Sequence, residues 1–371
     1  MKIAINTRQL LPNAMEGIGW YTFETLSRIV RQHPEHEFLF LFDRSYDERY
    51  IFAENVRPIV IWPPARHPFL YIWWFNYSVK KVLRQERPDI FISPDGFLSL
   101  GAKVPQLPVI HDLNFEHFPK DLPYWYRWYY RKYFPKFARA AKRILTVSEF
   151  SKEDIVQQYN IDPNKIDVAW NGVNDIFKPL DPTEQQKVRE EISNGQNYFL
   201  YIGAIHPRKN VGRLLQAFDN SNGPEKLVFA GEPFWWHDEM KKIYESMSRK
   251  EDVIFTGRLK QDRLAEVLAS ALCLCYVSYF EGFGIPLVEA MRCGTPVLAA
   301  KATSLPEVGG DAALYVDPFN VNDIANGLQR LANEPDLRNS LIKKGLERAK
   351  LFDWQKTADG MWQSIQRTLN A

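Results

Sequence analysis

Short runs of β-forming residues alternate with helical patterns along this 371-residue chain, and the alternation occurs in two rounds. Strands separated by helices predict parallel sheets with crossover helices, an α/β architecture. The first round predicts strands at Lys2–Asn6, Phe38–Phe42, Ile59–Trp62, Asp89–Ser93, Pro108–His111, Ile144–Ser148 and Ile166–Trp170. The second round predicts strands at Tyr198–Ile202, Lys226–Ala230, Val253–Thr256, Leu272–Val277, Pro296–Ala300 and Ala313–Val316.

The two rounds are separated by residues 171–197, a polar segment rich in turn formers that we interpret as a linker. Single hydrophobic cores rarely grow beyond about 250–300 residues, so two domains are expected. The tail carries three helical patterns, the last from Trp354 to Leu369. In two such α/β halves, ligands bind outside the carboxyl ends of the strands.

Composition excludes several classes of protein. The formal net charge of +2 argues against a dedicated nucleic-acid binder. The three cysteines are too few for a disulfide framework, and Cys273 and Cys275 have the spacing of core residues on one strand face. The N-terminus lacks the apolar core of a signal peptide, and no apolar run reaches the ~18 residues that span a bilayer. We therefore expect a cytoplasmic protein.

The most specific motif runs from Tyr279 to Gly294, directly after a predicted strand. Pro286 is typical of the first turn of a helix, and Gly294 of its C-terminal end. Glycines before this helix let a ligand approach the backbone, and the helix N-terminus favours an anion such as a diphosphate. Carboxylates repel phosphate, so Glu281 and Glu289 favour hydrogen bonds to sugar and ribose hydroxyls. The simpler interpretation is a helix cap beside a solvated glutamate.

A second motif, from Tyr201 to Asn210, also joins a strand to a helix. Arg208 and Lys209 supply positive charge where a leaving diphosphate would need it. A pair of solvated surface cations is the simpler alternative for an isolated Arg–Lys sequence.

Two further segments follow strands in the first half of the chain. His111 stands at the carboxyl end of a predicted strand, where a lone histidine is more often structural than catalytic. Asp112 could cap a helix or orient the imidazole. Gly17 and Gly19 follow the first strand as a G-x-G sequence, which also fits a tight turn.

Together these motifs resemble family 4 of the retaining glycosyltransferases, and the resemblance covers nearly the whole chain. The motifs occur in the family's order: the glycine loop, His111–Asp112, Ser148–Glu–Phe–Ser151, Asn171–Gly–Val173, Pro207–Arg–Lys–Asn210, then Glu281 and Glu289 with seven residues between them. The resemblance implies a GT-B fold, in which two Rossmann-like domains enclose a cleft and a C-terminal helix crosses back to the first domain. Residues 1–172 with 354–371 would bind the acceptor, and residues 173–353 the nucleotide sugar.

The resemblance also implies roles for individual residues. Glu289 would bind the donor ribose, Glu281 would face the sugar hydroxyls, and Arg208 with Lys209 would neutralise the diphosphate. The candidate catalytic residues are His111, Arg208, Lys209 and Glu281. The candidate donor-binding residues are Gly17, Gly19, Gly203, Arg258, Leu259, Gly282, Phe283, Gly284, Ile285, Pro286, Leu287 and Glu289, with Asp112 in support. One departure is Ala204, where many relatives have arginine; Arg208 would take over its task.

Several activities stay open at this point. Similarity to bacterial mannosyltransferases of surface-polysaccharide assembly favours GDP-mannose as the donor and a glycan or lipid-linked acceptor, with a UDP-sugar as the alternative. A sugar-nucleotide epimerase would share the fold but need no acceptor. A non-catalytic sugar-nucleotide-binding protein is the alternative outside enzymes.

The segment 124–143 combines many aromatic residues with seven basic and no acidic ones. This composition suits the headgroup region of an anionic membrane, so the chain could act as a peripheral membrane protein. The alternative is a helix whose aromatic residues pack on the first sheet, and Pro135 would kink or end that helix. Residues 1–172 hold 23 Lys and Arg against 19 Asp and Glu, which makes this the more basic part of the chain.

The sequence contains no Asp-x-Asp pair, the common metal-binding signature of sugar-transferring enzymes, and no phosphate-loop or serine-hydrolase motif. Because Arg208 and Lys209 can stabilise a leaving diphosphate instead, we expect no metal cofactor. Sugar transfer should therefore be largely unchanged by EDTA in a nucleotide-release assay. Complete loss of transfer with EDTA, restored by magnesium or manganese, would contradict this prediction.

Overall fold

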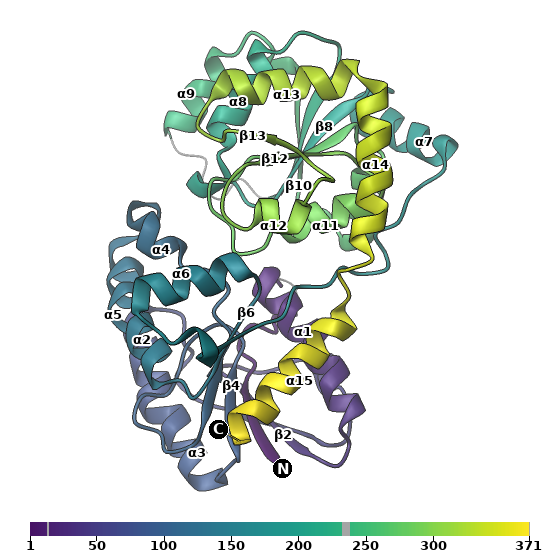
Figure 1. Cartoon of the computed structure of the whole chain (residues 1–371). Helices are drawn as coiled ribbons and strands as arrows, with labels where there is room; N and C mark the ends of the chain where they lie inside the picture. Colours follow the sequence, from purple (N-terminus) through teal and green to yellow (C-terminus); the bar gives the residue numbers. More distant parts are fainter. Residues whose placement is uncertain (13–14, 232–237, 371) are drawn as a thin grey trace. The chain divides into compact units, whose positions relative to one another are not determined.

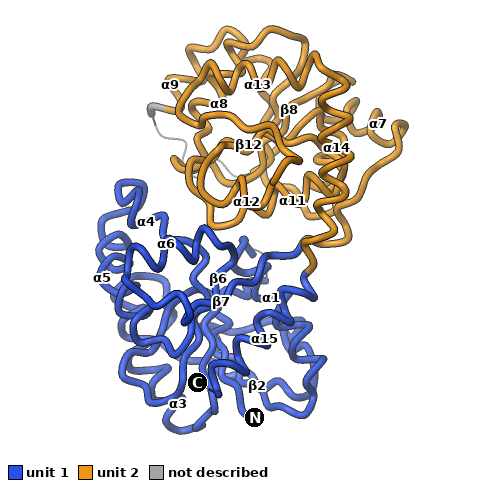
Figure 2. Tube along the Cα trace, viewed as in Figure 1, with its two compact units in different colours: residues 1–172, 354–371 blue, residues 173–353 orange. Residues whose placement is uncertain are grey.

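The computed structural model describes residues 1–12, 15–231 and 238–370. The chain divides into two compact units, which Figures 1 and 2 show. Unit 1 comprises Met1–Gly172 and Trp354–Ala371, and unit 2 comprises Val173–Asp353. Among the described residues, no helix is long and apolar enough to cross a membrane.

Unit 1 is built on a parallel five-stranded sheet with the strand order β3-β2-β1-β4-β5. A parallel pair, β6 and β7, continues it through a bridge between Val109 and Leu145. The strands are β1 (Lys2–Asn6), β2 (Glu37–Phe42), β3 (Val56–Val60), β4 (Ile90–Ser93), β5 (Gln106–Pro108), β6 (Ile144–Thr146) and β7 (Ile166–Val168). The helices are α1 (Gly17–Gln32), η1 (Glu48–Tyr50), α2 (Pro68–Trp73), η2 (Trp74–Val79), α3 (Lys80–Glu86), α4 (Asn114–His117), η3 (Pro119–Asp121), α5 (Tyr124–Ala140), α6 (Glu149–Tyr159) and η4 (Pro163–Lys165).

Helix α15 (Trp354–Asn370) returns the end of the chain to unit 1 and packs along α1 (Figure 1). Its Thr357 hydroxyl donates to the Trp170 carbonyl, and Ser364 and Arg367 both bind the carboxylate of Asp167. The C-terminal helix predicted to cross back to the first domain is therefore confirmed.

Unit 2 is built on a parallel six-stranded sheet with the strand order β10-β9-β8-β11-β12-β13. Figure 1 shows α8, α9 and α13 on one side of this sheet, and α11 and α12 on the other. The strands are β8 (Tyr198–Ile202), β9 (Lys226–Ala230), β10 (Val253–Gly257), β11 (Cys273–Tyr276), β12 (Val297–Ala300) and β13 (Leu314–Val316). The helices are α7 (Pro182–Ser193), η5 (Pro207–Lys209), α8 (Val211–Asn220), α9 (Asp238–Ser246), η6 (Lys250–Asp252), α10 (Gln261–Ala269), α11 (Ile285–Arg292), α12 (Leu305–Gly309), α13 (Val321–Asn333) and α14 (Pro335–Ala349).

The predicted α/β class with two Rossmann-like domains is confirmed, because each unit has a parallel sheet with crossover helices. Each strand of unit 2 lies within a residue or two of its predicted range. Cys273 and Cys275 are fully buried on β11, with their sulfur atoms 3.9 Å apart, as expected for core thiols.

The interpretation of residues 171–197 as a linker is wrong in part, because the segment contains helix α7. Asp181 accepts hydrogen bonds from the backbone N–H groups of Thr183 and Glu184, and the Glu184 side chain accepts from the Asp181 N–H. This capping box, with Pro182 in the first turn, starts a helix within a segment rich in turn formers.

Strands β3 and β5 of unit 1 differ most from their predicted ranges, and β6 and β7 each end two residues before the predicted end. Strand β3 pairs Val56–Val60 with Phe38–Phe42 and ends before Trp62. Strand β5 ends at Pro108, so His111 lies in the loop beyond the strand and not at its last residue. In both cases the register with the neighbouring strand decides the boundary, and apolar composition alone does not reveal that register.

Helix α5 contains most of the aromatic and basic segment 124–143. Tyr129, Phe134 and Phe137 are buried in the core of unit 1, whereas Tyr124 and Trp125 are exposed. The helix continues past Pro135 to Ala140, so this proline does not end it. Core packing therefore accounts for part of the aromatic content, and the first turn of α5 is left at the surface.

Candidate active site

In unit 2, the strand order reverses its direction between β8 and β11. The chain runs outward from β8 through β9 to β10 and then returns to place β11 on the other side of β8. In doubly wound sheets, the loops at such a switch point diverge and leave room for a ligand at the carboxyl ends of the strands. The two motifs singled out in the sequence directly follow β8 and β11.

The loop after β8 begins at Gly203, whose φ of +131° is one that glycine adopts readily. The His206 ring then accepts a hydrogen bond from the Arg208 N–H and starts the short helix η5. Arg208 and Lys209 occupy the last turn of η5, so their side chains leave the backbone within a few residues of the strand end.

The loop after β11 leads into α11, and Gly284 immediately precedes the helix with a φ of +99°. A Cβ atom at Gly284 would lie 2.7 Å from Leu305 Cδ2, so the position requires glycine for both space and backbone conformation. Phe283 and Leu287 are buried, and they therefore present main chain rather than side chain to a ligand. Pro286 lies in the first turn, as predicted. The amide groups at this helix N-terminus suit an anion.

One buried carboxylate joins the two loops. Glu281 Oε1 lies 2.6 Å from Lys209 Nζ and 2.9 Å from the Arg208 guanidinium. Lys209 also donates to the Tyr276 hydroxyl (2.8 Å), and Arg208 donates to the Phe280 carbonyl (3.2 Å). Burial opposes ionisation of Glu281, but Arg208 and Lys209 together lower its pKa to about 2. The group is therefore a fixed ion-pair cluster, with two positive charges and one negative.

The loop after β12 holds the backbone of Glu281 from both sides. Thr303 Oγ1 accepts from the Glu281 N–H (3.1 Å), and Ser304 Oγ donates to the Glu281 carbonyl (2.8 Å). Thr303 has a φ of +52°, which is rare for a β-branched residue. Tyr276, Thr303 and Ser304 were missed by the sequence analysis, since no motif marks them.

Glu289 has an environment opposite to that of Glu281. It lies about one turn into α11 and is half-buried. Burial raises the pKa of Glu289 to about 8, and no cation among the described residues lowers it. A carboxyl group of this kind is available to a hydrogen-bonding ligand.

Arg258 and Leu259 follow β10, two strands away from β8 in the same sheet. They therefore lie at the same carboxyl edge as the loops after β8 and β11. Arg258 is exposed and Leu259 is half-buried.

In unit 1, His111 follows β5 and its ring packs edge-on against Tyr21 of α1, with centroids 4.9 Å apart. His111 Nε2 donates to the Pro94 carbonyl (2.8 Å), and burial lowers the pKa of the ring. Burial thus favours the neutral imidazole, in which Nδ1 is the ring nitrogen left to accept a hydrogen bond. Asp112 precedes Leu113, the N-cap residue of α4, and its Oδ1 accepts from the Asn114 N–H (3.0 Å).

The glycines of the first loop have different surroundings. A Cβ atom at Gly19 would lie 2.8 Å from the Gln9 carbonyl, whereas one at Gly17 would meet nothing within 4 Å. Gly19 thus lets the Gln9 carbonyl pack closely against the start of α1, whereas the space beside Gly17 is open.

The loops after β1 and β4 form a buried network that the sequence analysis did not anticipate. Arg8 pairs with Asp95 at 2.7 Å, and Asn6 donates to the same carboxylate at 2.9 Å. The Arg8 guanidinium also lies over the Tyr71 and Phe97 rings. Because Arg8 is itself buried, this network fixes the loop positions rather than presenting a free cation.

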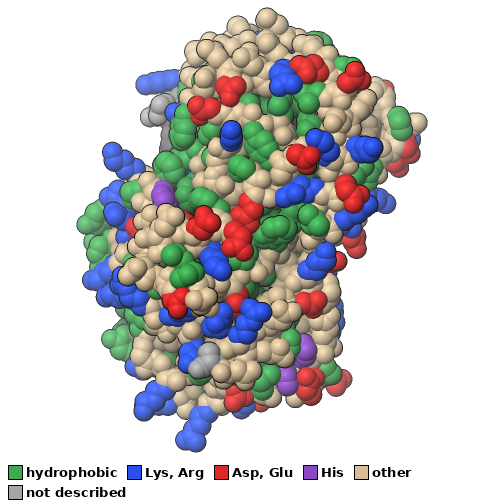
Figure 3. All heavy atoms as spheres, in the orientation of Figure 1, with side chains coloured by type: hydrophobic (Ala, Val, Ile, Leu, Met, Phe, Trp, Pro, Cys, Tyr) green, Lys and Arg blue, Asp and Glu red, His purple; other side chains and the backbone are tan. Residues whose placement is uncertain are grey.

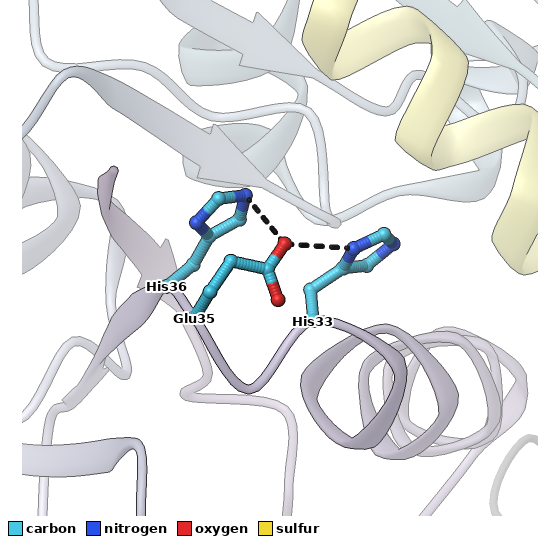
Figure 4. A group of neighbouring side chains, drawn as sticks. All are labelled: His33, Glu35 and His36. Atoms are coloured by element: carbon cyan, nitrogen blue, oxygen red, sulfur yellow. Dashed lines mark ion pairs between the residues drawn. The ribbon is translucent and has the colours of Figure 1, made fainter.

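Among the described residues, one group of side chains could hold a metal ion: His33, Glu35 and His36, shown in Figure 4. Glu35 Oε1 lies 3.5 Å from His33 Nδ1 and 3.2 Å from His36 Nε2. The group lies in the turn before β2, at the amino-terminal edge of the unit 1 sheet, and His33 stacks on Trp362 of α15 with centroids 3.6 Å apart. It therefore lies at the sheet edge opposite His111.

Two family models match the chain. The model for Glycosyltransferase Family 4 matches residues 15–176, and the model for Glycosyl transferases group 1 matches residues 182–348. The chain is 28% identical over 382 residues to O-antigen chain mannosyltransferase B of Escherichia coli. This match covers 96% of this chain and 97% of that protein. It is 32% identical over 242 residues to MMP alpha-(1->4)-mannosyltransferase of Mycolicibacterium hassiacum, covering 62% of this chain and 56% of that protein.

Solved structures share the fold over nearly the whole chain. Anabaena HepE, crystallised in complex with UDP-glucose, superposes with a TM-score of 0.79 at 17% identity, covering 99% of this chain and 100% of that chain. WaaG, a glycosyltransferase involved in lipopolysaccharide biosynthesis, superposes with a TM-score of 0.75 at 18% identity, covering 96% and 98%.

The raised pKa of Glu289 predicts a pH-dependent stability. The carboxyl group titrates near pH 8 in the folded chain and near its ordinary 4.5 in the unfolded chain. The folded state keeps a proton that the unfolded state releases, so the free energy of unfolding should fall as pH rises from about 5 to about 9. Glu289→Gln cannot ionise and should gain stability relative to the wild type as the pH rises.

Denaturant unfolding at several pH values measures this effect. Glu251→Gln, at an exposed position, is the matched control and should follow the wild type. Parallel pH profiles for the wild type and Glu289→Gln would show that Glu289 is ionised in the folded chain at neutral pH.

Proposed function

Because the chain belongs to the family 4 glycosyltransferases and has the GT-B fold, we propose that it transfers a hexose from a nucleotide-diphosphate donor to an acceptor hydroxyl. The observation that carries this proposal is the arrangement at the switch point of unit 2. Two fixed cations and a helix N-terminus follow neighbouring strands of one sheet. Such a site suits a diphosphate, which gains negative charge as it leaves.

Each candidate residue has a role in this proposal. Arg208, Lys209 and the main-chain amides of residues 284–287 hold the diphosphate. Glu289 accepts hydrogen bonds from the ribose, and Glu281 faces the donor sugar while it fixes both cations. Main chain at Arg258 and Leu259 meets the base.

His111, oriented through Pro94, contacts the sugar near the reacting carbon, and Gly17 and Gly19 admit the diphosphate to unit 1. The remaining members of the donor site are Gly203, Gly282, Phe283, Gly284, Ile285, Pro286 and Leu287.

The chemistry requires separation of charge. The bond between the anomeric carbon and the diphosphate oxygen breaks, the carbon acquires oxocarbenium character, and the acceptor oxygen forms the new bond. Arg208 and Lys209 stabilise the departing phosphate oxygens without reorganisation, because Glu281 and Tyr276 already hold them in place. No metal cofactor is part of the proposal.

We infer mannose, from GDP-mannose, as the transferred sugar. The support is the similarity over nearly the full chain to an O-antigen chain mannosyltransferase. The corresponding acceptor is a glycan or a lipid-linked glycan, which would place the enzyme on the cytoplasmic side of a membrane. In this proposal, residues 124–143 contribute to the contact between the enzyme and the membrane surface.

Single substitutions of the two cations test the diphosphate site. Arg208→Ala and Lys209→Ala should each reduce transfer by at least ~10-fold, because each removes a charge-assisted contact to the donor. Each variant leaves one cation to pair with Glu281, so the buried carboxylate is never left alone. Glu281→Gln and Glu289→Gln should cause losses of similar size.

Transfer is measured as nucleotide release in the presence of acceptor extract, with thermal unfolding recorded for every variant. Lys343→Ala, at an exposed position on α14, is the control and should keep wild-type activity. Near-normal transfer in folded Arg208→Ala and Lys209→Ala proteins would remove the diphosphate assignment.

Calorimetric titration with GDP and UDP tests the donor. We expect GDP to bind more tightly than UDP, and Glu289→Gln to weaken binding of both nucleotides, since both carry the ribose. Tighter binding of UDP would replace GDP-mannose by a UDP-sugar while leaving the reaction class intact.

A further inference from the structure

Exposed aromatic side chains gather in two segments of unit 1. The exposed fraction is 76% for Trp62, 57% for Trp73 and 62% for Tyr77. Solvent also reaches about half of the Phe69 and Trp125 side chains. We call the following set the aromatic patch: Trp62, Phe69, Leu70, Trp73, Tyr77, Tyr124 and Trp125. Contiguous apolar surface of this kind is uncommon on a soluble protein and marks an interaction site.

Ring contacts and hydrogen bonds join the two segments into one surface. The Phe69 and Trp125 rings lie 5.3 Å apart, and the Tyr126 hydroxyl donates to the Arg66 carbonyl. The Trp73 and Tyr77 rings also lie 5.3 Å apart. Ser78 donates to the Trp62 carbonyl, which ties the loop before α2 to the helix. The patch thus extends from the loop after β3 along α2 and η2 to the first turn of α5.

Incomplete core packing does not explain the exposed side chains of the aromatic patch. Tyr71, Trp74 and Phe75 of the same helical stretch are buried, as are Tyr129 and Phe134 of α5. Trp74–Val79 forms a π-helical turn, a rare conformation that is frequent at functional sites. The inward face of each helix is therefore filled, and further aromatic residues occupy the outward face.

The basic residues around the patch distinguish it from a binding site for a purely apolar partner. Residues 58–85 and 122–148 contain no Asp or Glu. The first segment carries Arg66, Lys80, Lys81 and Arg84, all exposed. In α5, the Lys132 and Lys136 ammonium groups lie over the Trp128 and Tyr133 rings. Figure 3 shows basic and hydrophobic side chains together along the edge where Figure 1 places α5 and α2.

We propose that the aromatic patch docks unit 1 on the surface of an anionic lipid bilayer. Trp and Tyr side chains prefer the headgroup region, where the ring is desolvated and the polar atom stays hydrated. Lys and Arg beside them are attracted to anionic headgroups. The chain would lie on the membrane. The proposal deepens the proposed function, since a lipid-linked acceptor would be presented at this surface.

Sedimentation of the full chain with vesicles tests the docking. We expect binding to vesicles that contain phosphatidylglycerol, weak binding to pure phosphatidylcholine, and loss of binding at high salt, because salt screens exposed charges. Trp73→Ser with Trp125→Ser should weaken binding by at least ~10-fold. Lys81→Gln with Arg84→Gln should weaken it by about 5-fold or more at low salt.

Matched controls come from exposed residues of α14 and the chain after it. Leu346→Ser with Leu351→Ser removes apolar surface of unit 2, and Lys343→Gln with Lys350→Gln removes two of its charges. Both control pairs should bind vesicles like the wild type. Nucleotide binding, measured by calorimetry, should be unchanged in every variant, which separates failed docking from a failed donor site or a failed fold.

Three results would overturn the proposal. They are no binding to anionic vesicles at low salt, equal binding to neutral vesicles, and binding unaffected by both the aromatic and the basic pair. Retention of the chain on an acceptor glycan, lost in the aromatic pair while vesicles do not bind, would instead assign the patch to sugar stacking.

Discussion

The carboxylate of Glu281 connects the two loops on which the donor site of unit 2 depends. Burying a carboxylate is costly unless opposite charges and hydrogen bonds surround it, and Arg208 and Lys209 meet that requirement at 2.9 and 2.6 Å. The same contacts hold the two cations at the carboxyl ends of β8 and β11 before any ligand arrives. Preorganised charge stabilises a leaving group without the cost of reorientation. Because the cluster keeps one net positive charge, the carboxylate orients the cations without cancelling them.

The position of that carboxylate depends in turn on backbone contacts from a third strand. Thr303, after β12, accepts from the Glu281 N–H while holding a φ of +52°. A backbone conformation of this kind costs on the order of 1–3 kcal/mol and persists only where the surroundings determine it. Ser304 supplies the second contact, at the Glu281 carbonyl. Loops after three neighbouring strands, β8, β11 and β12, therefore meet at one residue.

Local patterns in the sequence predicted much of this arrangement. Strands β8 and β9 were predicted with their observed bounds, and the positions of Arg208 and Glu281 after neighbouring strands follow from motif order. The contact between them does not, because it depends on β8 and β11 pairing across about 70 residues of chain. Helix α7 was missed because its capping box lies among turn formers. In α5, aromatic residues face both the core and the solvent, so periodicity alone could not separate the buried Tyr129 from the exposed Trp125.

Glu281 and Glu289 show how one residue type acquires two functions within a single motif. Both belong to the segment that follows β11, yet the pKa of Glu281 is lowered to about 2 and that of Glu289 is raised to about 8. The first stands beside two cations, whereas burial on α11 dominates the second. When their surroundings shift the pKa values of two carboxyl groups in opposite directions, the two groups can take different roles. Glu281 is thus a permanent charge that organises the diphosphate site. Burial raises the pKa of Glu289, and none of the described residues pairs a cation with it. A ligand rich in hydroxyls, such as ribose, can form hydrogen bonds with this carboxyl group, whereas a phosphate at that position would gain no cation from the described residues.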